Sequence, residues 1–316
     1  MIGIVGDLHI APPPEKRMDD YFQVGLNKIE EIAANVERVI FLGDIFTHPK
    51  VEPKYVNMLT QHLWYCKGKY GTHFYTIIGN HDVAHEEEEY LADSSLGTLK
   101  ASTVMDIITP DKPLIISDRG VVYRFNTIPV KYKTAKEYIQ GKVYTNSTED
   151  GIPCVDILLV HHEYETGTNC FSYNDFKDLN CKMIFLGHDH KPFDEGRIIY
   201  PEFTVYRSGS IMRNRADDYN FTRTLYYYTL DNNVVGCKAV TTTPFDKVFK
   251  VEAINKIETQ EKHYTEALEK IIEKYENNIS VKDIFSIKNI LIELNAKESI
   301  IDYIKKKYEN EGEVFV

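Results

Sequence analysis

The 316-residue sequence lacks several features that would assign a protein class at once. No run of apolar residues approaches the ~20 that a membrane-spanning helix needs. The first residues, 1–7, lack the basic flank and cleavage site of a signal peptide. We therefore expect no membrane segment and a cytoplasmic location, in a bacterium or in a phage-infected host cell.

Cysteine is also scarce. The cysteines are odd in number, lie far apart and form no Cys-x-x-Cys pair. This spacing argues against a disulfide framework and against a zinc finger. We therefore expect reduced thiols, some of them buried, at Cys66, Cys154, Cys170, Cys181 and Cys237.

Positive charge is in short supply too. The chain has 37 Lys and Arg against 48 Asp and Glu, which gives a formal net charge of −11 at pH 7. Proteins that bind nucleic acid usually carry a basic surface, because neutralising phosphates drives their affinity. The acidic balance therefore favours either a small substrate or a partner protein that supplies basic surface.

Short apolar runs alternate with amphipathic segments through the first two thirds of the chain. The runs at 2–5, 38–42 and 73–78 are rich in β-forming residues, and each is followed by a glycine and then a polar residue. Between the first two, Asp19 can cap a helix, and residues 54–66 are the second expected helix. This alternation predicts a layered α/β domain.

The middle of the chain has hairpin spacing instead. Apolar runs pair around short turns in two places and stop at histidines in two others. We therefore expect a mixed core, an α/β fold of α+β layered type with two sheets and helices outside. The paired runs are 114–117 with 121–125 and 225–230 with 234–240, and the single runs are 155–160 and 182–186.

After Pro244 the pattern changes to charged, amphipathic helices, with 247–251 as one further expected strand. We divide the chain into a domain at 1–243 and a C-terminal region at 244–316, a smaller cap of a strand and helices. The apolar stripe from Ile284 to Leu294 has two interpretations. It packs against the core as part of the cap, or it docks on a partner protein.

Five segments contain the residue types that bind metal ions, and each directly follows an apolar run. Because the ends of parallel strands converge on one edge of a sheet, loops there can aim side chains into a common crevice. Each segment alone is commonplace, since histidines at strand ends are usually solvated. Chance is a poor explanation for five in order. They are residues 6–9, 42–46, 79–82, 159–162 and 186–190.

These ordered motifs resemble the calcineurin-like metallophosphoesterase superfamily over roughly residues 1–240. They are Asp-x-His, Gly-Asp, Gly-Asn-His-Asp, His and Gly-His-x-His. Gly43-Asp-Ile-Phe46 and Arg207-Ser-Gly-Ser-Ile-Met-Arg213 look like the Mre11/SbcD-type nuclease branch, which includes phage recombination exonuclease subunits. The resemblance implies a two-sheet sandwich flanked by helices and two-metal hydrolysis of phosphodiester bonds.

The resemblance also implies the metal ligands. Each of two divalent metal ions would have three ligands of its own and would share one bridging carboxylate. Carboxylate, imidazole and amide ligands suit Mn, the expected metal, or Fe or Zn, better than Mg. The first ion would be held by Asp7, His9 and His190, the second by Asn80, His161 and His188, and the bridge would be Asp44.

The catalytic pair is implied in the same way. His81 would be the acid beside the leaving group, and Asp82 would orient it. Two neighbouring histidines compete for one ligand position. His161 is preferred over His162 because it stands directly at the end of the expected strand, as the family's ligand does.

Substrate-binding residues are less well defined. The nuclease branch often has a histidine directly after the phenylalanine of its Gly-Asp motif, whereas this chain has threonine and then His48. His48 either takes over that role or is an ordinary surface residue. Arg207, Arg213 and Arg215 form the densest basic cluster of the domain, and they either contact phosphates or are simple surface charges.

Three hypotheses of function follow. The first is a Mn-dependent DNA nuclease subunit, an exonuclease for which endonuclease activity is left open, acting in recombination, repair or DNA end processing. The resemblance implies a Rad50/SbcC-like ATPase bound through the C-terminal helices, and a homodimer. The second is a stand-alone metallophosphatase or phosphodiesterase on a small molecule or protein, which the acidic charge favours. The third is an inactive scaffold, against which the complete ligand set argues.

Overall fold

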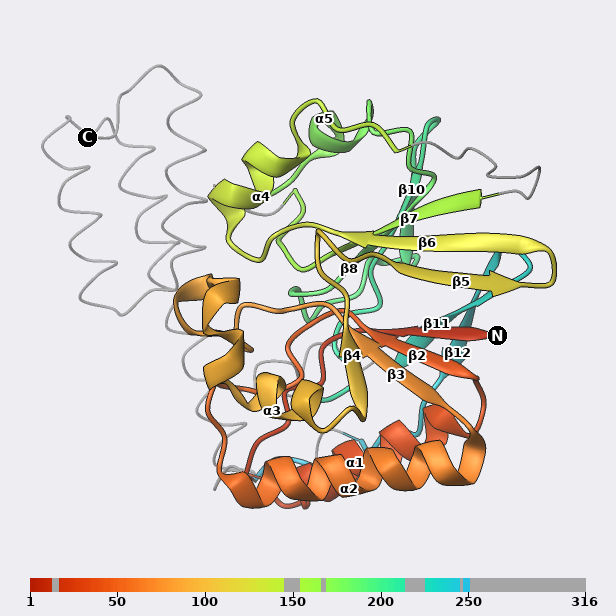
Figure 1. Ribbon diagram of the computed structural model, residues 1–316. Helices are drawn as coiled ribbons and strands as arrows, with labels where there is room; N and C mark the ends of the chain where they lie inside the picture. The colour runs from red at the N-terminus through yellow and green to blue at the C-terminus, as the bar shows by residue number, and fades with distance from the viewer. Residues whose placement is uncertain (13–16, 145–153, 166–168, 214–224, 245–246, 251–316) are drawn as a thin grey trace, which may run out of the picture. The chain divides into compact units, whose positions relative to one another are not determined.

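The computed structural model describes residues 1–12, 17–144, 154–165, 169–213, 225–244 and 247–250 (Figure 1). Met1–Glu165 and Asn169–Phe249 form one compact unit, and Thr166–Thr168 and Lys250–Val316 belong to a second. The expected C-terminal helices and Arg215 lie outside the described residues, and the division at residue 243 stays a prediction. Where a strand was expected at 247–251, Phe249 forms an isolated antiparallel bridge with Arg17.

The compact unit contains two sheets of six strands, which confirms the expected two-sheet α/β sandwich (Figure 1). The first sheet has the order β12 (Val234–Ala239), β11 (Tyr226–Asp231), β1 (Ile2–Val5), β2 (Arg38–Phe41), β3 (His73–Thr76) and β4 (Met105–Ile107). The second has the order β5 (Leu114–Asp118), β6 (Val121–Thr127), β7 (Cys154–Val160), β8 (Met183–Leu186), β10 (Thr204–Tyr206) and β9 (Arg197–Ile199).

Both sheets combine parallel strands with antiparallel ones. β1, β2, β3 and β4 are parallel neighbours, as are β6, β7, β8 and β10. The two expected hairpins are confirmed as β5–β6 and β11–β12. β11 also pairs antiparallel with β1, with Leu230 opposite Ile2. The first sheet therefore joins strands that lie more than two hundred residues apart in the sequence.

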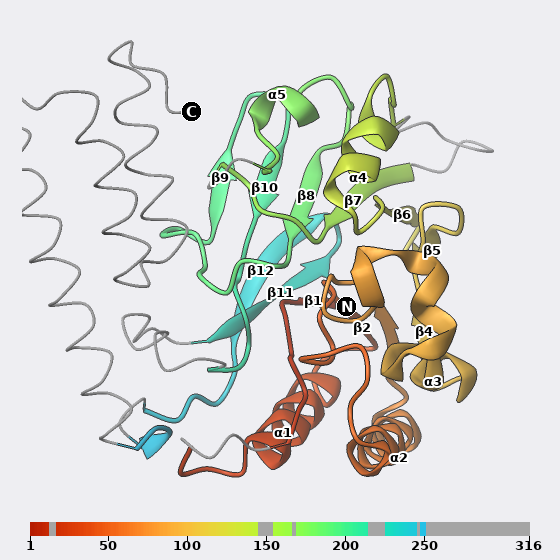
Figure 2. The ribbon, with the colours of Figure 1, turned by 90° about the vertical axis from the view of Figure 1, so that its left-hand side faces the viewer.

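Helices cover the outer face of each sheet (Figure 2). The first sheet is covered by α1 (Tyr21–Ala33), α2 (Pro53–Tyr70) and α3 (Ser95–Ala101), and the second by α4 (Tyr132–Ile139) and the short α5 (Tyr173–Phe176). Two 3₁₀ turns, η1 (Ala84–Glu86) and η2 (Glu88–Asp93), precede α3. This layering places the loops that follow β1, β2 and β3 next to those that follow β7 and β8.

The ends of the long helices follow local chemistry. Asp20, rather than the expected Asp19, caps α1: its carboxylate accepts from the Gln23 N–H at 3.1 Å, because it directly precedes the first helical residue. Asp19 instead pairs with Arg17 at 2.7 Å. α2 is longer than the expected 54–66, starting at a proline and ending at Gly71 in the left-handed conformation that glycine adopts easily.

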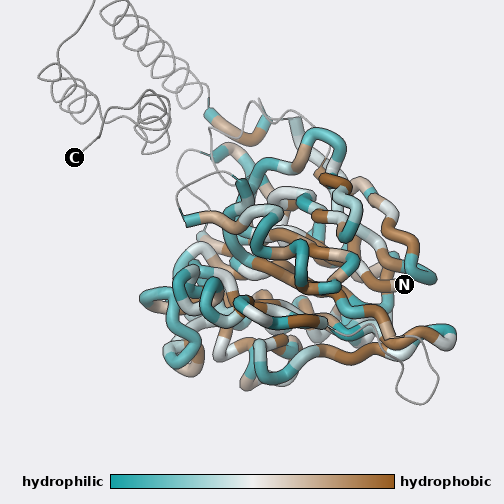
Figure 3. The backbone as a smooth tube through the Cα atoms, turned by 90° about the horizontal axis from the view of Figure 1, so that it is seen from above, coloured by the Kyte–Doolittle hydropathy of each residue, from teal (hydrophilic) through white to brown (hydrophobic). Residues whose placement is uncertain are grey.

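The apolar residues gather in three buried clusters, one between the sheets and one beneath each helical layer. Hydrophobic segments run through the strands, and hydrophilic ones form the surrounding loops (Figure 3). Ile4, Ile40 and Leu159 are fully buried between the sheets. Among the described residues, no helix combines the length and apolar character needed to cross a membrane.

Candidate metal centre

The expected ligands come from the carboxyl ends of parallel strands in both sheets. Loops after β1, β2 and β3 carry Asp7, Asp44 and Asn80, and loops after β7 and β8 carry His161 and His188. The side chains from these loops lie close together. The side chains fall into two groups of potential metal ligands: Asp7, His9 and His190, and Asp44, His161 and His188.

The first group is arranged as ligands around one point. His9 Nε2 and His190 Nε2 lie 2.9 Å apart, and Asp7 Oδ2 lies 4.0 and 3.8 Å from them. Asp7 Oδ2 is buried and has no hydrogen-bond partner within the described part of the chain. A buried carboxylate oxygen is costly to leave unpaired, so this donor set fits a cation.

The second group surrounds an amide oxygen. His161 Nε2 and His188 Nδ1 each lie 3.0 Å from Asn80 Oδ1. Asp44 Oδ2 lies 3.2 Å from His161 Nε2 and 3.5 Å from His9 Nε2. Asp44 therefore lies between the groups, where a bridging ligand is needed, and Asn80 joins the second group as expected.

The neighbouring histidines on β7 point to different surroundings. His161 Nδ1 donates to the Leu42 carbonyl at 2.6 Å, because a carbonyl can only accept, and this leaves Nε2 facing Asp44 and Asn80. His162 Nε2 donates to the Pro129 carbonyl at 2.9 Å, and its ring packs against Phe171. The geometry therefore favours His161 as the ligand.

Burial and mutual charge shift the pKa values of the ligand side chains. Burial raises the pKa of Asp7 to about 7 and lowers the pKa of His9 and of His188 to about 3. Burial alone would lower the pKa of His161, but the Asp44 carboxylate outweighs it and raises the pKa to about 10. The neutral His9 and His188 rings are in the ligand form, and the proton on His161 stands where a cation would compensate Asp44.

Backbone conformation brings the ligands close together. A Cβ atom on Gly79 would lie 2.1 Å from Asp44 Oδ1, so only glycine fits there. His9, Asp44 and His188 adopt positive φ angles of 51°, 48° and 74°, which cost energy for residues with a side chain. Such strain persists only where the surroundings enforce it, and here it falls on three of the expected ligands.

His81 lies at the edge of the centre, with its ring 5.1 Å from the His9 ring, centroid to centroid. Its Nδ1 donates to the Thr47 carbonyl at 2.8 Å, which leaves Nε2 to exchange a proton. The expected role of Asp82 in orienting His81 stays a prediction. Asp82 accepts from the backbone N–H groups of Phe46 and Gly79, at 3.2 and 3.0 Å, and so fixes the loop.

Of the expected substrate-binding residues, the structure describes His48, Arg207 and Arg213. Arg207 and Arg213 are buried, which argues against surface phosphate contacts. Arg207 pairs with Asp189, and Arg213 donates to the Thr243 carbonyl. His48 is exposed beside Thr47.

The Ser208–Arg213 segment supports the ligand loops instead. Ser210 Oγ donates to the Asp7 carbonyl at 2.9 Å, and the Ser210 N–H donates to the His190 carbonyl at 3.2 Å. Sequence reasoning missed this supporting role because backbone carbonyls at distant positions leave no residue signature. The serines of the late motif were the only available signal.

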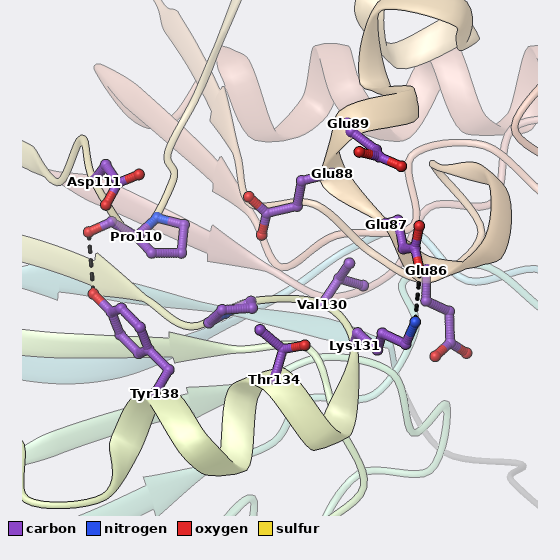
Figure 4. Close-up of a pocket in the computed structure, with 11 residues that line it drawn as sticks. Glu86, Glu87, Glu88, Glu89, Pro110, Asp111, Val130, Lys131, Thr134 and Tyr138 are labelled. Atoms are coloured by element: carbon purple, nitrogen blue, oxygen red, sulfur yellow. Dashed lines mark hydrogen bonds and ion pairs between the residues drawn. The ribbon is translucent and has the colours of Figure 1, made fainter.

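A polar cavity adjoins the loop that carries His81 and Asp82. It is a cavity of about 410 Å³ lined by Glu86, Glu87, Glu88, Glu89 and Asp111, with Lys131 and an apolar floor that includes Val130 (Figure 4). Lys131 Nζ pairs with Glu87 at 2.5 Å. We call this cavity the acidic pocket.

Residues 1–192 match the model of the calcineurin-like phosphoesterase family, and the chain belongs to this family. No curated sequence matches the chain. Family membership makes the chain a hydrolase of phosphoester bonds, and its two ligand groups correspond to a dimetal centre. A branch within the family is not distinguished by this match.

Several solved structures are similar to the chain at low identity. A dimetal phosphatase from Danio rerio has 10% identity and a TM-score of 0.45, over 75% of this chain and 95% of that one. The purple acid phosphatase of yellow lupin seeds has 11% identity and a TM-score of 0.38, over 66% and 43%. A protein of unknown function from Aquifex aeolicus has 15% identity and a TM-score of 0.30, over 61% and 81%.

Proposed function

We propose that this protein is a Mn-dependent DNA nuclease subunit of the Mre11/SbcD type, an exonuclease that also has endonuclease activity. The observation that carries the hydrolytic part is the position of Asp44 Oδ2, 3.2 Å from His161 Nε2 and 3.5 Å from His9 Nε2. One carboxylate oxygen thus serves both ligand groups. DNA as the substrate rests on the motifs Gly43–Phe46 and Arg207–Arg213.

Each metal ion would have its own set of ligands in this chain. Asp7, His9 and His190 would hold one ion, Asn80, His161 and His188 the other, and Asp44 both. When bound, the two ions supply Lewis acidity to the phosphate and a water nucleophile at neutral pH. The carbonyls and N–H groups that fix the ligand loops keep these side chains in place before a substrate arrives.

Proton donation is the part assigned to His81. A departing sugar oxygen needs a proton, and a positioned imidazole can supply it. Because the Thr47 carbonyl holds Nδ1–H at 2.8 Å, the transferable proton is on Nε2. Asp82 acts one step further away, by tying the Gly79 and Phe46 backbones that flank His81 and Asp44.

A partner protein is part of the proposal. A Rad50/SbcC-like ATPase would bind the stripe from Ile284 to Leu294, and a homodimer is expected. Such a complex would supply the basic surface that a chain of net charge −11 lacks. The stripe lies outside the described residues, so this step is supported by sequence alone.

A stand-alone metallophosphatase or phosphodiesterase is the second candidate. The acidic pocket favours it, because five acidic side chains beside the His81 loop would repel a long polyanion more than a small phosphoester.

The deciding experiment compares substrates. The protein is incubated with Mn, linear duplex DNA and, separately, nitrophenyl phosphate esters, with and without an ATPase of the stated type. DNA cleavage that His81→Ala abolishes supports the nuclease. Turnover of the small esters without DNA cleavage, even with the ATPase present, would replace it by the second candidate.

A further inference from the structure

The loop after β8 carries one potential ligand of each group within three residues. His188 belongs to the second group and His190 to the first, with Asp189 between them. The placement of this single residue therefore affects how the two groups face each other. Asp189 is held by Arg207, a residue that the hydrolytic mechanism does not use.

The contact between the two residues is close and largely buried. Arg207 Nη1 lies 2.7 Å from Asp189 Oδ2, and the exposed fractions of the two side chains are 7% and 26%. The Arg207 guanidinium also stacks over the Phe193 ring, with its Cζ 4.0 Å from the ring centroid. Within the described residues neither Nε nor Nη1 of Arg207 makes a hydrogen bond, so the ion pair with Asp189 is the contact that compensates this buried charge.

The fold explains why Arg207 reaches this loop. Arg207 directly follows β10, which is the parallel neighbour of β8, with Tyr206 opposite Phe185. Its backbone is fixed on both sides, since its N–H donates to the Gly196 carbonyl and its carbonyl accepts from the Phe193 N–H. The side chain thus extends from a rigid strand end onto a loop.

The loop needs such support because its backbone is strained. His188 has a φ of +74°, and its N–H donates to Asp7 Oδ1 at 3.1 Å. At the other end the Ser210 N–H holds the His190 carbonyl. Between these two tethers, Asp189 accepts from the Lys191 N–H at 3.0 Å through Oδ1 and meets Arg207 through Oδ2.

We propose that Arg207 and Asp189 form a positioning pair that holds the loop so that one histidine enters each ligand group, and thereby sets the affinity for both metal ions. This inference rests on the proposed two-metal function. Neither residue needs to touch a metal or substrate. Groups that orient metal ligands typically contribute about 10–100-fold to metal affinity.

The test is a Mn titration of the full chain by calorimetry, together with electron paramagnetic resonance of the loaded protein. Asp189→Asn and Arg207→Gln are each expected to weaken Mn binding by about 10–100-fold. They should also reduce the signal of a coupled Mn pair. Arg207→Lys should recover part of the affinity, and the double variant should bind no more weakly than the weaker single variant.

Arg197→Gln is the matched control, because Arg197 is an exposed arginine on the neighbouring strand β9. All titrations are made well below the melting temperature of each variant, so that loss of fold does not imitate loss of ligand position. If Arg207→Gln does not fold, Asp189→Asn decides, because it changes one partly exposed group. Two Mn ions bound with unchanged affinity in the Asp189→Asn protein would overturn the proposal.

Failure of the proposed function gives a different result. A wild-type chain that binds two Mn ions but cleaves no DNA contradicts the nuclease assignment, and the titration of the variants still decides the role of the pair. Additive losses in the double variant would show that Arg207 and Asp189 act independently, which contradicts the pair itself.

Discussion

The metal centre and the acidic pocket adjoin the same loop, yet their acidic side chains have opposite environments. In the metal centre Asp7 and Asp44 are buried among histidines, and burial and mutual charge move the pKa values of most of these groups far from their usual range. In the acidic pocket Glu86 and Glu89 are exposed, and Lys131 forms an ion pair with Glu87.

The difference teaches how to separate a reactive cluster from a merely charged one. Asp7 has a buried oxygen with no hydrogen-bond partner in the described chain, so it calls for a cation. The pocket carboxylates can be hydrated, and a surface ion pair such as Lys131–Glu87 contributes little to stability. Chemistry is therefore expected in the first region, and an influence on substrate approach in the second.

The largest expected effect on activity comes from removing one carboxylate in the metal centre, compared with removing one in the acidic pocket. Asp44→Ala should lower phosphoester hydrolysis by about 10²–10³-fold or more, because one carboxylate serves both ligand groups. Asp111→Ala, its counterpart in the acidic pocket, should change hydrolysis less than about twofold. Rates on a small diester with Mn measure both, and retained activity in Asp44→Ala would refute the assigned centre.

The next effect concerns two histidines on one loop. His81→Ala should slow cleavage of DNA by about 10²–10⁴-fold, because the sugar oxygen leaves poorly without a proton. A nitrophenyl ester, whose leaving group needs no proton, should lose far less. His85→Ala, in the exposed part of the loop, is the control. Equal losses on both substrates would mean that His81 binds the phosphate instead of donating a proton.

Metal affinity should depend on pH through the centre alone. With pKa values of about 7 for Asp7 and about 10 for His161, both are protonated at pH 6, and Mn binding must displace both protons. The overall constant for binding both ions should therefore rise with pH, by roughly a hundredfold per unit below pH 7 and roughly tenfold per unit between pH 7 and 10.

Calorimetry in buffers of different ionisation heat counts these protons. Roughly two should be released at pH 6 and roughly one at pH 8. The variant Glu88→Gln, in the acidic pocket, should leave the profile unchanged, although burial raises the pKa of Glu88 as well. A flat profile for the wild-type chain would show that the centre binds metal without giving up protons.

The smallest effect tests the acidic pocket itself. The double substitution Glu86→Gln, Glu89→Gln should raise kcat/KM on DNA by roughly 2- to 5-fold at low salt, because it removes repulsion of a polyanion. The gain should vanish at high salt, and a small ester should show none. If DNA cleavage is unchanged at every salt concentration, the pocket does not face the path of the substrate.

The metal centre was predictable from sequence because each ligand stands directly after a strand. Strand ends and ligand chemistry indicated a metal site near Asp7, Asp44 and His188, since parallel strands bring their ends together, and the family resemblance supplied the assignment of each ligand. The hairpins at β5–β6 and β11–β12 were predictable for a similar reason, because their turns are local.

Side-chain partners across the fold were not predictable. Asp82 was expected to orient His81, and its backbone N–H partners could not be foreseen, because any residue type can supply them. Arg207 was expected either to contact phosphates or to be a surface charge, but it directly follows β10, the parallel neighbour of β8, and is buried. The choice of Asp20 over Asp19 as the helix cap shows the same limit at short range, since adjacent aspartates have equal propensity.

The pairing of β1 with β11 has a consequence for synthesis of the protein. Ile2 faces Leu230, so one edge of β1 stays unpaired until about 225 further residues have been made. At ~5–20 residues per second this takes roughly 10–45 seconds of translation. His188 and His190 also emerge late. Asp7, Asp44 and His81 are therefore synthesised long before the late ligands that complete the hydrolytic centre. An incomplete chain on the ribosome is expected to be inactive.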